Sequence, residues 1–269
     1  MSSNRMVVAA SISPLADFAK KVGGDLVEVE LLVPAGASPH TFQLTPQQMN
    51  TLSKASVLIL NGVGLEFWAD KAISAADNPN LKVVRTADGL DIIDDVDEEH
   101  GKGGNPHVWL SPVCAISQVK AIRDAFIEAD PQHKYSYAAN AAHFIGQLEQ
   151  LDSEIRRQVE SFSTNKFVAF HPAWVYLARD YGLVQAAVIE KSPGVEPSPS
   201  EASDVVRTVR KIEARAIFAE PQFSPKVAEV IAQESGARVL ILDPLGKPDD
   251  YDYIKMMRAN LKQMAEALR

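Results

Sequence analysis

The sequence contains a single cysteine, Cys114, among 269 residues. One cysteine cannot form an intramolecular disulfide, and it excludes zinc or iron–sulfur sites built from several thiolates. Its position in an apolar stretch after residues 109–112 (WLSP) predicts a buried small side chain.

The sequence also lacks a long apolar run and an excess of positive charge. No run approaches the roughly 20 apolar residues that span a bilayer. The 27 basic and 35 acidic residues give a formal net charge of −8. This balance argues against nucleic acid or an anionic membrane as the main partner and suits a cation as ligand. Residues 1–6 lack the apolar core of a signal peptide, so we expect either a cytosolic protein or one that lost a targeting segment.

Two catalytic motifs are absent from the sequence. Without a GxxxxGK[ST] phosphate loop, we expect any ATPase role to belong to another chain. Without HExxH, the zinc-protease pattern is missing as well. The apolar content of 46% and the charged content of 23% are ordinary for a globular protein.

The first half of the chain alternates short β-rich runs with helical patterns. We expect strands at residues 7–11, 27–33, 57–60 and 82–86, and helices at 12–22 and from Pro46 onward. Thr45 is the expected N-cap of the latter helix, with Pro46 at its first helical position. This alternation predicts a parallel sheet covered by helices. The acidic, glycine-rich residues 91–104 predict a loop.

A long helical segment is expected from about Asp130 to Phe162. Its apolar positions recur every three or four residues, at Phe144, Leu148, Leu151, Ile155, Val159 and Phe162. About 30 residues at 1.5 Å each make roughly 45 Å, which favours a rigid connector between two lobes.

After this connector the alternation of strands and helices resumes. Strands are expected at 167–170, 185–189, 216–219 and 238–242, and helices at 173–181, 201–214, 225–236 and 250–268. The predicted architecture is therefore α/β, with a parallel-sheet lobe at 1–129, the long spanning helix at 130–163 and a second lobe at 164–269. A cleft is expected where the two lobes meet.

Three histidines and one aspartate lie in proline-flanked segments, namely 38–40 (SPH), 105–109 (NPHVW), 170–172 (FHP) and 242–244 (LDP). His171 and Asp243 directly follow expected strands, and His40 comes seven residues after another. Ligands of open α/β sheets bind beyond the carboxyl ends of the strands. Three imidazoles and a carboxylate form a donor set that suits a borderline divalent metal in tetrahedral geometry. The sequence therefore predicts a metal site formed by His40, His107, His171 and Asp243.

Glu220, which ends the expected strand before Pro221, is the rival to Asp243. It either binds the metal directly or orients a ligand histidine through a hydrogen bond, and Asp243 could do the latter or cap a helix. His133 and His143 have no companion ligand at four residues' spacing and are expected on a helix surface. His100, in the acidic loop, is a candidate for a weak cation-collecting site. Trp68, Trp109 and Trp174 are expected in the core or in the wall of the site.

Two other functions fit parts of this pattern. A zinc hydrolase needs an open metal position and a general base, for which Glu220 is a candidate. A receptor for a metal chelate or another small solute would place arginines or aromatics at its cleft. A role in surface adhesion finds no support among the residues.

Eight ordered motifs resemble the zinc/manganese solute-binding proteins of ABC transporters (cluster A-I, or cluster 9). They are residues 10–15 (ASISPL), 39–46 (PHTFQLTP), 61–66 (NGVGLE), 105–112 (NPHVWLSP), 170–174 (FHPAW), 193–198 (PGVEPS), 220–223 (EPQF) and 242–246 (LDPLG). The resemblance covers nearly the whole chain. It implies two lobes with a spanning helix, an extracytoplasmic location that is periplasmic or membrane-anchored, and a membrane permease with its ATPase as partners. It also implies that the ligands are His40, His107, His171 and Asp243.

The chain departs from the family pattern at two places. Zinc members often carry a histidine-rich loop near residues 91–104, where this chain has only His100, and no export signal or lipidated cysteine is present. Manganese members commonly have a glutamate where this chain has His171. A nitrogen-rich set favours zinc over manganese, so Zn²⁺ is the expected ion and Mn²⁺ the alternative. We expect a monomeric receptor and not an enzyme.

We predict that zinc affinity falls as the pH drops below about 6.5, because protonated imidazoles cannot bind a metal. Zinc titrations between pH 5 and 8 measure this dependence. A constant affinity over that range would contradict a site dominated by histidines.

Overall fold

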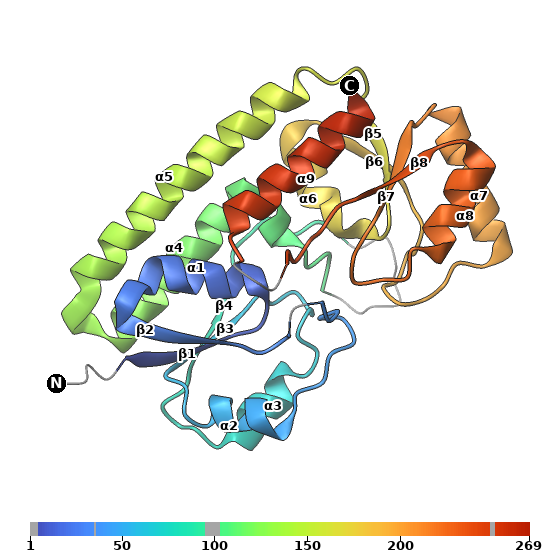
Figure 1. The fold of residues 1–269 in the computed structure, drawn as a ribbon. Helices are drawn as coiled ribbons and strands as arrows, with labels where there is room; N and C mark the ends of the chain where they lie inside the picture. The colour runs from blue at the N-terminus through green and yellow to red at the C-terminus, as the bar shows by residue number, and fades with distance from the viewer. Residues whose placement is uncertain (1–4, 35, 95–102, 248–250) are drawn as a thin grey trace. The chain divides into compact units, whose positions relative to one another are not determined.

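The computed structural model describes residues 5–34, 36–94, 103–247 and 251–269 (Figure 1). The chain divides into two compact units, neither of which is continuous in sequence. The first unit comprises Met1–Asp91, Pro112–Gln150 and Leu245–Tyr253, and the second comprises Ile92–Ser111, Leu151–Pro244 and Ile254–Arg269. The predicted lobes were continuous segments, whereas segments of the two units alternate along the chain. No helix among the described residues has the length and apolarity to cross a membrane.

The first unit contains a four-stranded parallel sheet in the order β2-β1-β3-β4. Its strands are β1 (Met6–Ala10), β2 (Val27–Leu31), β3 (Val57–Leu60) and β4 (Lys82–Arg85). All four strands were predicted, with ends within two residues. Every residue of β3 is buried, as expected for an interior strand that is covered on both faces.

Four helices of the first unit are α1 (Ser13–Gly23), α2 (Pro46–Leu52), α3 (Ala69–Ala76) and α4 (Pro112–Ala129). The predicted cap of α2 is confirmed, because the Thr45 hydroxyl accepts from the Gln48 N–H in a capping box with Pro46 in the first turn. Neither α3 nor α4 was predicted from the sequence. The buried residues of α4 are spaced three or four positions apart on one face, but the apolar Val113, Ile116 and Ile127 lie outside that face and obscure the amphipathic pattern. Cys114 lies in α4 and is buried, as predicted.

The predicted long helix is α5 (Lys134–Val159), whose 26 residues correspond to about 39 Å. A short 3₁₀ turn, η4 (Pro131–His133), precedes it, and the boundary between the two units falls within α5. Phe144, Leu148, Leu151 and Ile155 of the predicted stripe are buried, whereas Val159 and Phe162 are half-buried.

The second unit contains two pairs of parallel strands, β5 (Lys166–Ala169) with β6 (Val184–Val188) and β7 (Ala216–Ala219) with β8 (Arg238–Ile241). Its helices are η3 (Val108–Leu110), η5 (Pro172–Trp174), α6 (Val175–Tyr181), α7 (Pro199–Lys211), α8 (Lys226–Ser235) and most of α9 (Tyr253–Leu268). These strands and the four α-helices match the predicted pattern, with boundaries shifted by up to three residues.

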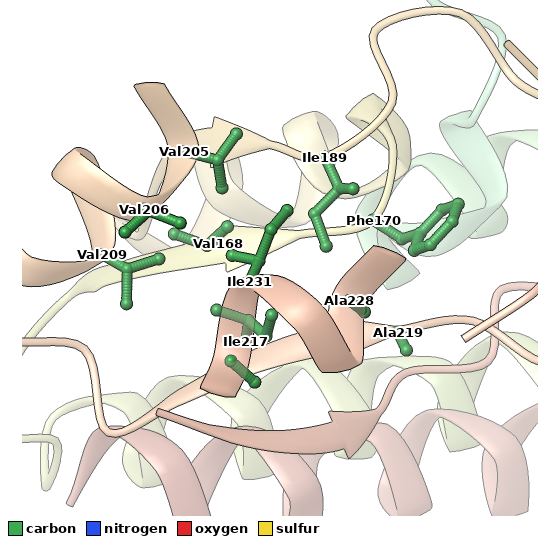
Figure 2. Packing of buried hydrophobic residues seen from close by; sticks show 11 residues of the cluster. Val168, Phe170, Ile189, Val205, Val206, Val209, Ile217, Ala219, Ala228 and Ile231 are labelled. Carbon is green, nitrogen blue, oxygen red and sulfur yellow. The ribbon is translucent and has the colours of Figure 1, made fainter. Parts of the chain in front are cut away.

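One apolar cluster holds the strand ends of the second unit. Figure 2 shows side chains of α7 and α8 packed against those of β5 and β7. Phe170 and Ala219 belong to this cluster, and each directly precedes a residue singled out by the sequence analysis, His171 and Glu220. Packing of this cluster therefore fixes the backbone next to His171 and Glu220.

A buried carboxylate in the first unit connects α1 to the start of α9. Oδ2 of Asp17 accepts a hydrogen bond from the Tyr253 N–H at 3.1 Å, and Lys21 pairs with Asp252 at 3.0 Å. The Phe18 and Tyr253 rings meet edge to face, with centroids 4.9 Å apart. Burial raises the pKa of Asp17 to about 6, although the Tyr253 N–H and the Lys21 charge oppose this rise.

We predict that Asp17→Asn makes the free energy of unfolding less dependent on pH. The folded pKa of about 6 lies above the reference value of 3.8. Stabilisation by the bound proton is therefore complete below about pH 3.8 and is lost as the pH rises through 6. The stability of wild type relative to Asp17→Asn should fall by about 2 kcal/mol between pH 4 and pH 7. Urea denaturation at several pH values measures this difference, and a constant difference would contradict the assignment.

Candidate metal centre

Each strand of the second unit is followed closely by an ionisable residue. His171 comes two residues after β5, Glu190 two after β6 and Asp243 two after β8, while Glu220 directly follows β7. Because the strands of each pair are parallel, these residues leave the carboxyl ends of their strands, where α/β proteins bind ligands.

His171 and Glu220 contact each other directly. The Nδ1 atom of His171 lies 2.8 Å from Oε1 of Glu220, and each residue is 2% exposed. A carboxylate can only accept, so this contact places the hydrogen of a neutral imidazole on Nδ1. The Nε2 atom of His171 then carries its lone pair, as metal-binding histidines do when a carboxylate orients them.

Asn105 orients His107 in the same way. Its Oδ1 atom lies 3.1 Å from the His107 backbone nitrogen and 3.0 Å from Nδ1 of His107. The Nδ2 group of Asn105 donates to the Pro172 carbonyl at 2.7 Å, so the amide orientation is fixed and Oδ1 is the acceptor. The backbone carbonyl of Asn105 accepts a hydrogen bond from the Tyr176 hydroxyl at 2.6 Å. His107 therefore also carries its hydrogen on Nδ1 and a lone pair on Nε2.

The two lone pairs face each other. The Nε2 atoms of His107 and His171 are 3.0 Å apart, and the ring centroids are 4.8 Å apart with the planes at 70°. Two imidazole ligands of one tetrahedral zinc ion, with Zn–N near 2.05 Å, have their nitrogens roughly 3.3 Å apart. The pair thus has the spacing and orientation of two ligands that share one cation.

Aromatic rings surround this histidine pair. The Trp109 ring lies 5.2 Å from His107, and the Phe223 ring lies 5.5 Å from His171 while it stacks on Phe170 at 5.0 Å. The predicted burial of Trp68, Trp109 and Trp174 is confirmed. Apolar walls lower the local dielectric constant, which strengthens the attraction between a cation and its ligands.

Asp243 is half-buried, and its backbone is held in place. Its N–H and its carbonyl pair with the amide of Asn260, both at 2.8 Å, and its Oδ1 accepts from Gln222 at 3.0 Å. Its rival Glu220 contacts a candidate ligand directly, through the hydrogen bond from Nδ1 of His171.

Three further histidines, His40, His133 and His143, lie among the described residues. His40 belongs to the first unit, where it is half-buried in a turn in which the Thr41 N–H donates to the Ser38 carbonyl at 3.3 Å. His143 is exposed on α5, as predicted. His133 ends the 3₁₀ turn before α5, where its Nδ1 lies 2.6 Å from Asp130. His100 lies outside the described residues.

The sequence analysis assigned no role to Asn105, Glu190 or Phe223. A signal for Glu190 was present, since it follows an apolar strand just as His171, Glu220 and Asp243 do. Asn105 stands two residues before a candidate ligand, but its bond to Pro172 depends on tertiary structure.

Comparisons with known proteins identify the family of this chain. The family model of the periplasmic zinc-uptake complex component A, ZnuA, matches residues 8–267. The zinc-binding lipoprotein AdcA of Streptococcus pneumoniae (strain ATCC BAA-255 / R6) is 30% identical, and the match covers 98% of this chain and 56% of AdcA. The high-affinity zinc uptake system protein ZnuA of Bacillus subtilis (strain 168) is 28% identical, with coverage of 98% and 88%.

A solved structure shows the same fold. The crystal structure of a ZnuA protein superposes with a TM-score of 0.89 and 37% identity, and the match covers 98% of this chain and 99% of the other. The chain spans about half the length of the AdcA relatives that it matches. Because the family model matches nearly the whole chain, this protein belongs to the ZnuA family of periplasmic zinc-uptake components.

Proposed function

We propose that this protein binds Zn²⁺ outside the cytoplasm and delivers it to the permease of an ABC importer. The observation that carries the proposal is the buried pair of Nε2 atoms, 3.0 Å apart, with both Nδ1 atoms engaged by hydrogen-bond acceptors. The names of the zinc-binding AdcA and zinc-uptake ZnuA relatives support the choice of ion.

The proposed ligands are His107 and His171 of the second unit, His40 of the first unit and Asp243. In this arrangement Glu220 does not bind the ion but orients His171 and stabilises the positive charge that it gains on coordination.

Zinc is favoured over manganese by the chemistry of the donors. Three imidazoles and one carboxylate suit a borderline ion, whereas Mn²⁺ prefers sites rich in oxygen. The relatives' names, which include a lipoprotein and a periplasmic component, support an extracytoplasmic location. We further propose that the receptor acts as a monomer and that a separate ATPase drives transport.

Hydrolysis and chelate binding are less well supported. Glu220, the candidate base, is engaged through Oε1 with Nδ1 of His171. A chelate would bring its own donors, whereas two lone pairs 3.0 Å apart already match a bare ion.

We predict that His107→Ala lowers zinc affinity by at least two orders of magnitude, because it removes one of two preoriented ligands. Calorimetric titration of chelator-stripped protein with Zn²⁺ and Mn²⁺ measures the effect. His143→Ala removes an exposed histidine and serves as the matched control, with an affinity within twofold of wild type. Equal affinities of wild type and His107→Ala would refute the site.

We predict that Glu220→Gln and Asp243→Asn differ in severity. The glutamine oxygen can still accept from His171, so zinc affinity should fall roughly 10- to 100-fold, as is typical when a ligand's hydrogen-bond partner is changed. Loss of a direct ligand in Asp243→Asn should cost more. Competition titrations against a chelator of known affinity rank the two variants. The reverse order would make Glu220 the fourth ligand.

A further inference from the structure

A second buried carboxylate, Glu190, lies near His171 but is not among the proposed ligands. Its residue is 5% exposed and follows β6 by two positions. Its backbone N–H donates to the carbonyl of Phe170 at 2.7 Å, and Phe170 directly precedes His171. Glu190 is therefore attached to the strand end that carries the candidate ligand.

The side chain of Glu190 is held by the loop that follows it. Its Oε2 atom accepts from the Gly194 N–H at 2.9 Å, where the positive φ of 82° favours glycine. Burial raises the pKa of Glu190, and the charges of Glu196 and Glu220 act in the same direction, whereas the Gly194 N–H and His171 lower it. The carboxylate thus acts on the site electrostatically while a backbone group fixes its position.

Two buried carboxylates lie near one pair of imidazoles and concentrate acidic groups at this site. Buried charges of like sign raise each other's energy, and burial itself adds a desolvation cost for each. A divalent cation held by the two Nε2 atoms would offset both charges at once. A monovalent cation at the same position would offset half as much.

On the basis of the proposed metal-binding function, we propose that Glu190 is a charge partner of the bound ion that does not coordinate it. Its role is to raise the affinity of the site for divalent over monovalent cations. The attraction between Glu190 and the ion is proportional to the ion's charge. Removing the Glu190 charge should therefore change the logarithm of the affinity twice as much for a divalent as for a monovalent ion.

The test compares Zn²⁺ with Ag⁺, a monovalent ion that also binds imidazole nitrogen, in chloride-free nitrate buffer. Glu190→Gln keeps an oxygen that can accept from Gly194 but removes the charge. We expect zinc affinity to fall roughly 10- to 100-fold and silver affinity roughly 3- to 10-fold. Glu196→Gln makes the same change on an exposed residue of the adjacent loop and should alter either affinity by less than about twofold, because water screens its charge.

The outcomes distinguish failure of the charge-partner inference from failure of the proposed metal-binding function. Zinc and silver affinities that fall by the same factor in Glu190→Gln would assign the residue a purely structural role and overturn the charge-partner inference, as would no change. Absence of tight zinc binding by wild type would instead overturn the proposed function. Circular dichroism and thermal melting check that the variant is folded. If Glu190→Gln does not fold, Glu190→Ser, which leaves room for water at Gly194, is measured against the same criterion.

Discussion

The candidate site depends on holding two imidazole nitrogens without hydrogens 3.0 Å apart in a buried setting. Two lone pairs at that distance repel each other, and burial removes the water that would otherwise separate them. The arrangement is favourable only when a proton or a cation lies between the nitrogens. The hydrogen-bond acceptors on the opposite side of each ring, Asn105 and Glu220, direct both lone pairs to this point.

The fold of the second unit supplies the rigidity that this arrangement needs. The apolar cluster of α7, α8, β5 and β7 holds Phe170 and Ala219 in place. Because these two residues directly precede His171 and Glu220, the cluster also fixes the backbone positions of His171 and Glu220. Asn105 connects the segment that carries His107 to the carbonyl of Pro172, next to His171. A preorganised pair of ligands costs less conformational entropy when it captures an ion.

Local patterns in the sequence predicted much of this fold. The run of Val57–Leu60 is bounded by polar and turn-forming residues, and its limits as a strand agree with the structure. The cap of α2 followed from Thr45 and Pro46 alone. By contrast, α4 was not predicted because apolar residues outside its buried face, Val113, Ile116 and Ile127, obscure the helical periodicity. The exchange of residues 92–111 and 245–253 between the units depends on long-range contacts that a linear pattern does not reveal.

At the candidate site, too, local patterns predicted some residues, whereas contacts between distant residues were not predictable from the sequence. Proline-flanked histidines after apolar runs pointed to His107 and His171, which the structure places in contact through their Nε2 atoms. The hydrogen bonds that select the tautomers involve partners 49 residues away, as for Glu220, or depend on a bridge across 67 residues, as for Asn105. The involvement of His40 and Asp243 remains a proposal based on the motifs and the family.

The most direct test is a crystal structure of the zinc-loaded protein with anomalous diffraction at the zinc absorption edge. We predict one fully occupied zinc ion about 2.0–2.1 Å from Nε2 of both His107 and His171, with His40 and one carboxylate completing a tetrahedron. A zinc ion bound through an Nδ1 atom, or held elsewhere while these two imidazoles remain in mutual contact, would contradict this account.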